Sequence, residues 1–381
     1  MIGFGIIIPI LPYFAGSFGA TPAEVGAVIG AYAAAQFIAA PLLGRLSDRY
    51  GRRNTLFFTT AFAVTGYVIL GLAESLLLIF ISRILTGFMS GNISVAQAYI
   101  SDITDIKNRA KGYGILGAAF GLGLVTGPAL GGFLSNWGYS AAAYGAAFLN
   151  LLSIIVIFFY LPETINPGAL TQNQQKFGFD LDSLISALKR PFAGPILKIR
   201  FVFSIGFSIF TTVFAIYTET GLHLSAQMTA WLLTYAGILI VIIQGFLVDR
   251  LTYFISEAKL LFFSTILLAA SLIGWAFIRS VPMLYVVLIP LALAGGVFNT
   301  VINSALSKIV DEQEIGGMLG ISASVESSTR IFAPSMGAYL LSEWGLWAPG
   351  FISAIIILAV IPFAWKHFYK APHFALNKVK S

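Results

Sequence analysis

The sequence predicts an all-α membrane protein of twelve transmembrane helices, arranged as two pseudo-symmetric bundles of six. Three observations predict it: the composition, the spacing of long apolar runs, and a repeat between the two halves of the chain. The 381 residues are 58% hydrophobic and 10% charged, whereas soluble domains average about 25% charged residues. A soluble chain of this composition would expose large apolar patches and aggregate. Lipid is therefore the expected solvent for most of the surface.

Each expected span is a run of about 20 mostly apolar residues, the length that crosses a bilayer as a helix. In the first half these runs are Ile2–Phe18, Glu24–Leu43, Thr55–Leu72, Leu76–Ile100, Gly112–Leu134 and Ala141–Leu161. In the second half they are Ile196–Thr218, Gln227–Val248, Lys259–Phe277, Pro282–Ile309, Gly316–Leu341 and Trp347–Trp365.

The basic residues predict the orientation of these spans. With both termini in the cytoplasm, 19 of the 22 Lys and Arg residues fall in inner loops and tails, and Arg200 is one of these 19. The exceptions are Arg83, Arg279 and Arg330. Because cytoplasmic loops carry an excess of Lys and Arg, this asymmetry supports both the span count and a multi-pass protein of the plasma or inner membrane.

A polar stretch divides the chain into six spans and six. We expect an N-terminal bundle over 1–161, a cytoplasmic linker over 162–195, a C-terminal bundle over 196–366 and a basic cytoplasmic tail over 367–381. Within the linker, Asp180–Lys189 predicts a short amphipathic helix, because four apolar residues share one helical face and Asp180 can cap it. Such a helix is expected to lie along the membrane surface.

The two halves repeat at a fixed offset of 206 residues. The matched pairs are Gly114 and Gly320, Asp105 and Asp311, Pro128 and Pro334, Gly131 and Gly337, and Leu134 and Leu340. Two parallel halves, each an inverted three-plus-three repeat, form the architecture of the major facilitator superfamily. The sequence thus resembles that family in its overall plan.

Several classes of function have no support in the residues. Cysteine is absent and the three histidines are scattered, so we expect no metal site. No Walker loop, Ser/His/Asp set or other catalytic constellation is found, which predicts that the chain is not an enzyme and uses no cofactor. Its basic residues lie in short loops rather than on one face, which argues against nucleic acid. The expected partners are a small-molecule substrate, protons and the bilayer, with the chain acting as a monomer.

The segment between the second and third spans resembles the signature loop of the major facilitator superfamily. Six residues make up this predicted conformational latch: Gly44, Asp48, Arg49, Gly51, Arg52 and Asp102. The glycines permit a tight turn, and the resemblance implies that Asp48 lies against the start of the eleventh span, near Gly316, where helical N–H groups favour an anion. It also implies that Arg52 bridges to Asp102. The alternative is that these arginines only determine topology.

The fifth span carries a string of small residues that resembles the antiporter motif of drug:proton exporters. It comprises Gly123, Gly127, Pro128, Gly131 and Gly132. Small residues at every fourth position let helices pack backbone to backbone, and ordinary packing is the plainer interpretation. In the fourth span, Arg83 with Gly87 resembles a companion motif whose arginine is implicated in proton transfer.

Further strings at Gly3–Pro12, Ala98–Thr104 and Leu161–Thr164 resemble the tetracycline:proton antiporters and their multidrug relatives. That resemblance implies proton-driven export of lipophilic or amphiphilic small molecules by alternating access. Two acidic residues of that family, in its first and ninth spans, have no match here. The alternative functions are transport of a sugar, organic acid or other metabolite, and a receptor or scaffold that transports nothing.

Charged and amide residues within the spans are the remaining site candidates, because they are costly in a bilayer and usually functional. Glu326 and Arg330 lie one turn apart, near the middle of the eleventh span. They predict either a structural ion pair or a carboxylate that exchanges a proton during coupling, together with Arg83. The amides Gln36, Asn92 and Asn299 could line a substrate cavity or join helices by hydrogen bonds.

Overall fold

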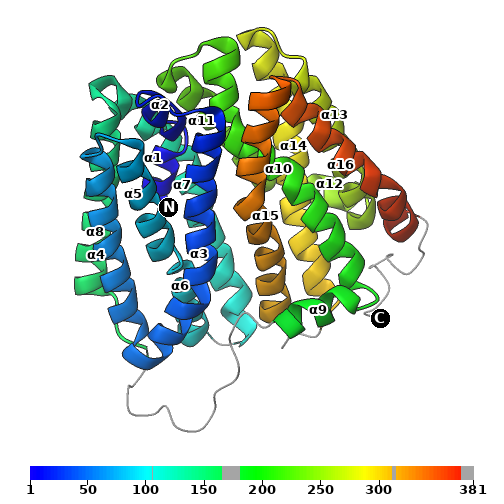
Figure 1. The fold of residues 1–381 in the computed structure, drawn as a ribbon. Helices are drawn as coiled ribbons and strands as arrows, with labels where there is room; N and C mark the ends of the chain where they lie inside the picture. The colour runs from blue at the N-terminus through cyan, green and yellow to red at the C-terminus, as the bar shows by residue number, and fades with distance from the viewer. Residues whose placement is uncertain (105, 165–180, 311–314, 370–381) are drawn as a thin grey trace. The chain divides into compact units, whose positions relative to one another are not determined.

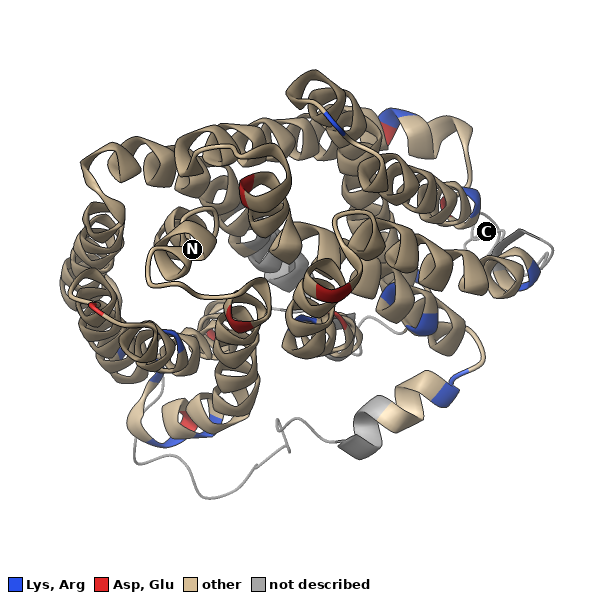
Figure 2. Ribbon diagram, turned by 45° about the horizontal axis from the view of Figure 1, so that its top comes forward, with Lys and Arg blue, Asp and Glu red and all other residues tan. Residues whose placement is uncertain are grey.

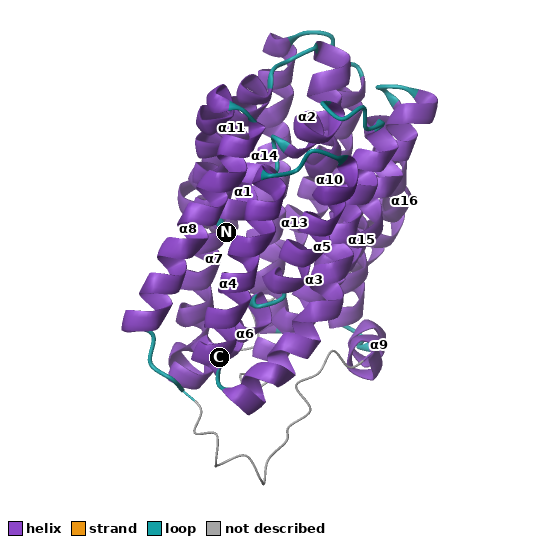
Figure 3. Ribbon diagram, turned by 60° about the vertical axis from the view of Figure 1, so that its left-hand side comes forward, coloured by secondary structure: helices purple, strands orange, loops and turns teal. Residues whose placement is uncertain are grey.

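The computed structural model describes residues 1–381 except 105, 165–180, 311–314 and 370–381. Throughout that part of the chain every regular element is a helix, as the colouring of Figure 3 shows. Nine helices among the described residues are long and apolar enough to cross a membrane. Charged residues are sparse along the ribbon (Figure 2). A multi-pass helical membrane protein is thereby confirmed, and the count of twelve spans stays a prediction.

Contacts between Cα atoms divide the chain into two units. The first comprises Met1–Ser183 with Leu224–Thr234, and the second comprises Leu184–His223 with Tyr235–Ser381. The predicted boundaries at 161 and 196 stay predictions, and part of the linker and most of the tail lie outside the described residues. The helices of the first unit are α1 (Ile2–Ile7), α2 (Leu11–Gly16), α3 (Pro22–Tyr50), α4 (Arg52–Gly71), α5 (Leu76–Ser90), α6 (Ile93–Ile103), α7 (Ile106–Leu134) and α8 (Tyr139–Tyr160).

The second unit begins within the linker helix and holds most of the remaining chain. Its helices are α9 (Leu181–Lys189), α10 (Ala193–Leu222), α11 (Ala226–Ile242, whose first residues cluster with the first unit), α12 (Val248–Phe254), α13 (Glu257–Ala276), α14 (Val281–Lys308), α15 (Ile315–Trp344) and α16 (Ala348–Ala364). The short helix α9 runs across one end of α10, as Figure 1 shows. This is the amphipathic helix expected from the linker sequence.

The same pattern of helix packing occurs in both units. In the first, α1 packs on α7 and α8, and α4 packs on α5 and α8. In the second, α10 packs on α15 and α16, and α13 packs on α14 and α16. Gly138 and Gly345, each directly after a tryptophan, both have positive φ, at 100° and 91°. The repeat seen in the sequence is therefore a repeat of structure.

The first predicted span is not one helix. Instead of a continuous Ile2–Phe18, the structure has α1 and α2 separated by a turn at residues 8–10. Pro9 and Pro12 explain the break, because neither supplies the backbone N–H that would bond to the preceding turn. Discontinuous spans of this kind leave backbone carbonyls available in transporters.

The fourth predicted span is also interrupted, at Gly91 and Asn92 between α5 and α6. A Cβ at Gly91 would lie 2.8 Å from the backbone nitrogen of Ala40 and 2.9 Å from Ala39, both in α3. The interruption therefore lies at a close crossing with α3, where only glycine leaves room for the backbone.

The predicted loop after the second span is largely helical. The sequence reading ended that span at Leu43, but α3 continues to Tyr50, and α4 begins only two residues later. Gly44 is thus a helical residue, while Gly51 alone makes the turn, with φ of 97°. A helix can continue beyond the membrane through mostly polar residues, and hydropathy does not detect such an extension.

Candidate functional site

Arg52, in the first turn of α4, is the buried centre of a polar cluster whose two carboxylates are partly exposed. Its Nε donates to Asp102 Oδ2 at 3.0 Å, and one Nη nitrogen lies 2.6 Å from Asp48 Oδ1. The other Nη donates to Ser47 Oγ at 2.5 Å. Arg52 itself is only 8% exposed. We call Ser47, Asp48, Arg52 and Asp102 the Arg52 cluster; it joins the ends of α3 and α6 to the start of α4.

Glu163 caps the same helix from far along the chain. Its Oε1 accepts hydrogen bonds from the backbone nitrogens of Arg52, at 2.8 Å, and Arg53, at 3.4 Å. Two of the unpaired N–H groups at the start of α4 are thereby satisfied. Thr164 adds a hydrogen bond to Asp102 Oδ2 at 3.1 Å. The sequence analysis found the Leu161–Thr164 string but assigned it no role, because only the fold brings it beside Arg52.

The remaining latch residues are placed as follows. Arg49 is exposed, with its guanidinium 5.4 Å from the centre of the Tyr50 ring. A Cβ on Gly44 would lie 3.7 Å from Ser94 Oγ, so this position packs without crowding. The expected partner of Asp48 near Gly316 falls where the structure does not describe the side chains, so that contact stays a prediction.

The glycines of the antiporter string pack directly against the backbone of α1. A Cβ on Gly127 would lie 2.6 Å from the Cα of Gly5, and one on Gly123 would lie 3.1 Å from the backbone nitrogen of Ile2. In return, a Cβ on Gly5 would lie 2.6 Å from the carbonyl of Gly123. Because no side chain separates the two backbones, α1 and α7 form a close seam, and Gly131 continues it against Ile6.

Two further residues of the string have other surroundings. Gly132 is buried on another side of α7, where a Cβ would lie 2.6 Å from that of Ala230. Pro128 stands inside α7 and is buried, with its ring facing Gly5 in the seam. All five residues of the string are therefore packing residues of the first unit.

Arg83 lies deep within the first unit, on α5, and is 2% exposed. Its guanidinium carbon is 5.4 Å from the centre of the Tyr32 ring and 5.5 Å from that of Tyr67. Its Nε and one Nη have no hydrogen-bond partner in the described structure, and no described carboxylate lies within ion-pair distance. Aromatic faces attract such a cation. Gly87, one turn on, packs against the backbone of Tyr32.

Glu326 has two arginine partners, one of which the sequence analysis misplaced. Arg330 donates to Oε1 at 2.8 Å, and Arg200 donates to Oε2. Arg200 was assigned to an inner loop, but it lies inside α10 and is 4% exposed. It also donates to Asn303 Oδ1 at 3.3 Å. We call Arg200, Glu326 and Arg330 the arginine–glutamate triad. The predicted span Ile196–Thr218 already contained Arg200, but its charge placed it with the residues of the inner loops.

The amides proposed for a substrate cavity are divided by their contacts. Gln36 donates to the carbonyl of Ser90 at 3.3 Å, and Asn92 donates to Thr59 Oγ1 at 3.2 Å. Both bonds join neighbouring helices, which favours packing for these two. Asn299, on α14, is half-buried, and its role as a cavity residue stays a prediction.

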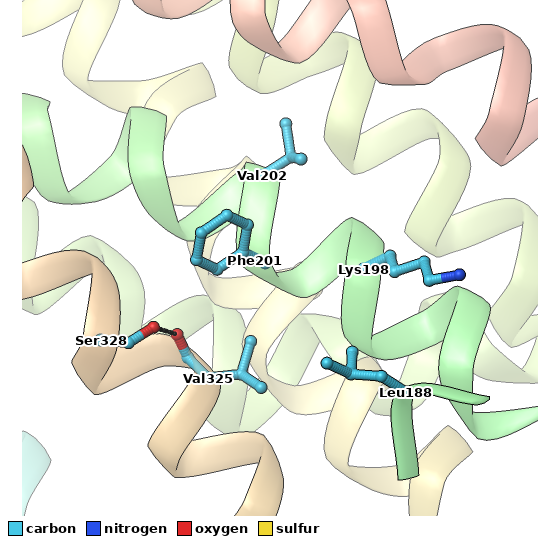
Figure 4. Close-up of a pocket in the computed structure, with 6 residues that line it drawn as sticks. All are labelled: Leu188, Lys198, Phe201, Val202, Val325 and Ser328. Atoms are coloured by element: carbon cyan, nitrogen blue, oxygen red, sulfur yellow. Dashed lines mark hydrogen bonds between the residues drawn. The ribbon is translucent and has the colours of Figure 1, made fainter. Parts of the chain in front are cut away.

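A cavity of about 380 Å³ lies among α9, α10 and α15. Figure 4 shows its lining of Leu188, Lys198, Phe201, Val202, Val325 and Ser328. Its walls are mainly apolar, and the ammonium group of Lys198 extends away from the other five residues. Among the residues that the structure describes, no group of His, Asp and Glu side chains is arranged to hold a metal ion.

Comparisons with known proteins agree with this fold and these motifs. The model of the Major Facilitator Superfamily matches residues 1–278 and 199–380. The tetracycline resistance protein, class B, of Escherichia coli is 29% identical over 91% of this chain and 88% of its own length. Solute carrier family 22 member 18 of Mus musculus is 29% identical over 94% of this chain and 90% of its own.

A solved structure gives the same answer for the fold. The crystal structure of the human organic anion transporter MFSD10 (TETRAN) superposes with a TM-score of 0.69 at 20% identity, covering 95% of each chain. The family match spans nearly the whole sequence, and the helix packing repeats in two halves. This chain belongs to the major facilitator superfamily and is a secondary active transporter, not an enzyme.

Proposed function

We propose that this transporter exports lipophilic or amphiphilic small molecules in exchange for protons, by alternating access. It acts as a monomer in the plasma or inner membrane, with both termini in the cytoplasm. The observation that carries the proposal is the seam between α1 and α7, where the antiporter string meets the backbone of α1. The similarity to tetracycline resistance proteins of Escherichia coli and Pasteurella multocida, at 29% and 28% identity, supports the same class of substrate.

The seam has a physical use in an exchanger. Backbones that touch without intervening side chains leave little room for water between the helices. A water-filled path there would let protons cross without substrate and dissipate the gradient. The break between α1 and α2 lies directly after the seam, so that α2 can move while α1 stays packed.

The Arg52 cluster is proposed as the conformational latch of the first unit. Buried ion pairs are strongly destabilised when one partner is removed, so the cluster favours the conformation in which its three helix ends meet. A change of conformation that separates α3, α4 and α6 must break these bonds. Asp48 is the member that can change partners, because its side chain is 44% exposed while that of Arg52 is 10% exposed.

Proton coupling is assigned to the surroundings of Arg83, whose guanidinium stays charged and acts on a neighbouring group rather than carrying the proton itself. Of the three coupling candidates it is the one with unsatisfied donors and no described carboxylate partner. Glu326 has both oxygens engaged by arginines, which favours the structural ion pair over a proton carrier. Arg83→Gln should therefore abolish transport driven by a pH gradient while substrate exchange continues, whereas Glu326→Gln should leave substrate-induced proton release in place.

The proposal is tested with the purified full chain in liposomes under an imposed pH gradient. The assay compares lipophilic dyes, antibiotics, sugars and lysolipids. Movement of a dye or antibiotic that requires the gradient supports proton-coupled export. Movement of sugars alone would favour the metabolite transporter, and movement of no compound would favour a protein without transport activity.

A further inference from the structure

The arginine–glutamate triad carries a net positive charge. Glu326 accepts from Arg330 through Oε1 and from Arg200 through Oε2, so both carboxylate oxygens are occupied. Two cations and one anion leave a formal charge of +1. Charges within a span are costly and are normally compensated. One positive charge of this group therefore lacks a counter-ion among its own members.

The hydrogen-bonding groups of the triad that lack any partner are donors on the cationic side. A guanidinium group has five N–H donors. Arg200 uses its two Nη nitrogens, but its Nε is buried without a partner in the described structure. Arg330 donates through one Nη alone, and its side chain is 52% exposed. A group that binds here must accept hydrogen bonds and carry negative charge.

The position of Arg330 indicates a wet site rather than lipid. It lies about 22 Å along α15 from Ile315, near the middle of a helix about 45 Å long. A guanidinium that faces hydrocarbon at such a depth is costly. Because the side chain of Arg330 is 52% exposed, we infer that its exposed side faces polar surroundings rather than lipid.

The first unit, considered by itself, also contains a positive charge without a described counter-ion. Arg83 is buried with two unpartnered nitrogens and no described carboxylate at ion-pair distance.

The cavity of Figure 4 is not this site. Lys198 and Val202, which line it, each lie two residues from Arg200 on α10. Two residues correspond to about 200° around a helix, so the cavity and Arg200 are on different sides of α10.

We propose that Arg200 and Arg330 bind a negatively charged group of the substrate, so that the transported molecules are amphiphilic organic anions such as carboxylates or sulfonates. Glu326 stays paired and orients the two guanidinium groups. The inference rests on the proposed function, since it takes the triad as part of a transport site for amphiphiles.

Equilibrium binding tests the proposal independently of transport. The purified full chain in detergent is titrated with pyrenebutyrate, pyrenebutanol and a pyrenebutyl trimethylammonium salt, which share one aromatic body and differ in charge. Pyrenebutyrate should bind most tightly. Arg330→Gln should weaken its binding about tenfold, the loss expected for one charge-assisted hydrogen bond, and leave pyrenebutanol unchanged. Arg330→Lys should keep part of the preference.

Glu326→Gln separates binding from a merely structural role. This variant raises the formal charge of the triad to +2, so pyrenebutyrate should bind more tightly than to the wild type. A structural triad would instead lose stability without gaining affinity. Arg279→Gln, which removes an exposed loop arginine of the same unit, is the matched control and should change nothing. Thermal unfolding of each variant checks that it is folded.

The proposal is overturned if the cation binds as tightly as the anion, or if both Arg330 and Glu326 variants leave the anion preference unchanged. Transport is then measured with the same three probes. Anion-selective binding without proton-dependent flux would contradict the proposed exporter and support the anion site. Proton-dependent flux that prefers the cation would support the proposed exporter and contradict the anion site.

Discussion

Two ion pairs occupy matching places in the two halves of this transporter, with opposite charges. In the first half Arg52, at the start of α4, pairs with Asp102 at the end of α6, at 3.0 Å. In the second half Glu257, at the start of α13, pairs with Lys308 at the end of α14, at 2.7 Å. Asp102 and Lys308 are 206 residues apart, the offset of the repeat. The repeated fold therefore places an ion pair at this junction, and either of the two positions can hold the cation.

The two pairs differ in their surroundings. Arg52 is buried, with Asp48 and Ser47 as additional partners, whereas the side chain of Lys308 is 51% exposed. Ser304 is the further partner of Glu257, at 2.7 Å. Exposed ion pairs contribute little to stability, while buried ones are costly to break. The first pair is thus the one that can restrain a conformational change.

The largest expected effect is that of Arg52→Gln. It leaves Asp48 and Asp102 without their cation, so we expect transport to be lost and the free energy of unfolding to fall by about 3 kcal/mol. Lys308→Gln is the matched change in the second half and should cost less, because Lys308 is exposed and Ser304 keeps its hydrogen bond to Glu257. Liposome flux and denaturant unfolding measure the two effects. Equal losses of flux and of unfolding free energy in the two variants would contradict the difference proposed between the two ion pairs.

Asp48→Asn should abolish most transport while the protein remains folded and inserted. The side chain keeps its shape and loses its charge, so the variant separates electrostatics from packing. Asp249→Asn, at the corresponding place in the second half, should be milder, because Asp249 is exposed and makes no ion pair among the described residues. Wild-type flux in the Asp48 variant would rule out an electrostatic latch.

The smallest effect is expected from exchanging the charges within one pair. Glu257→Lys together with Lys308→Glu should restore most of the flux that either single change removes, because the junction tolerates either polarity. The same exchange at Arg52 and Asp102 should not restore flux, since a carboxylate at position 52 would face Asp48 and Glu163. Flux in liposomes, with expression level as control, compares the two exchanges; rescue in both halves would mean that Asp48 is dispensable.

The sequence was informative wherever a property is periodic or repeated. Apolar runs located the spans, the 206-residue offset predicted two matching halves, and the motif residues Arg52 and Asp102 lie in contact as the family resemblance implied. Adding the same offset to Asp102 gives Lys308, so one member of the second ion pair could be predicted from the sequence.

Tertiary contacts were not predictable in the same way. Glu163 is 111 residues from Arg52, and nothing local marks it as a helix cap. Arg200 was assigned to a loop because basic residues near a span end usually lie there, and its burial depends on Glu326 and Asn303 from other helices. The break between α1 and α2 depends on Pro9 and Pro12, which transmembrane helices often accommodate without breaking.

The direction of proton movement tests the central claim most directly. Liposomes that contain the purified protein and the trapped pH indicator pyranine, with no pH gradient and with the membrane potential clamped, receive a transported substrate on the outside. Exchange predicts that substrate entering the vesicle expels protons, so the interior becomes alkaline, and that Arg83→Gln abolishes this change. Acidification of the interior would contradict the account, because it would show that substrate and proton move together.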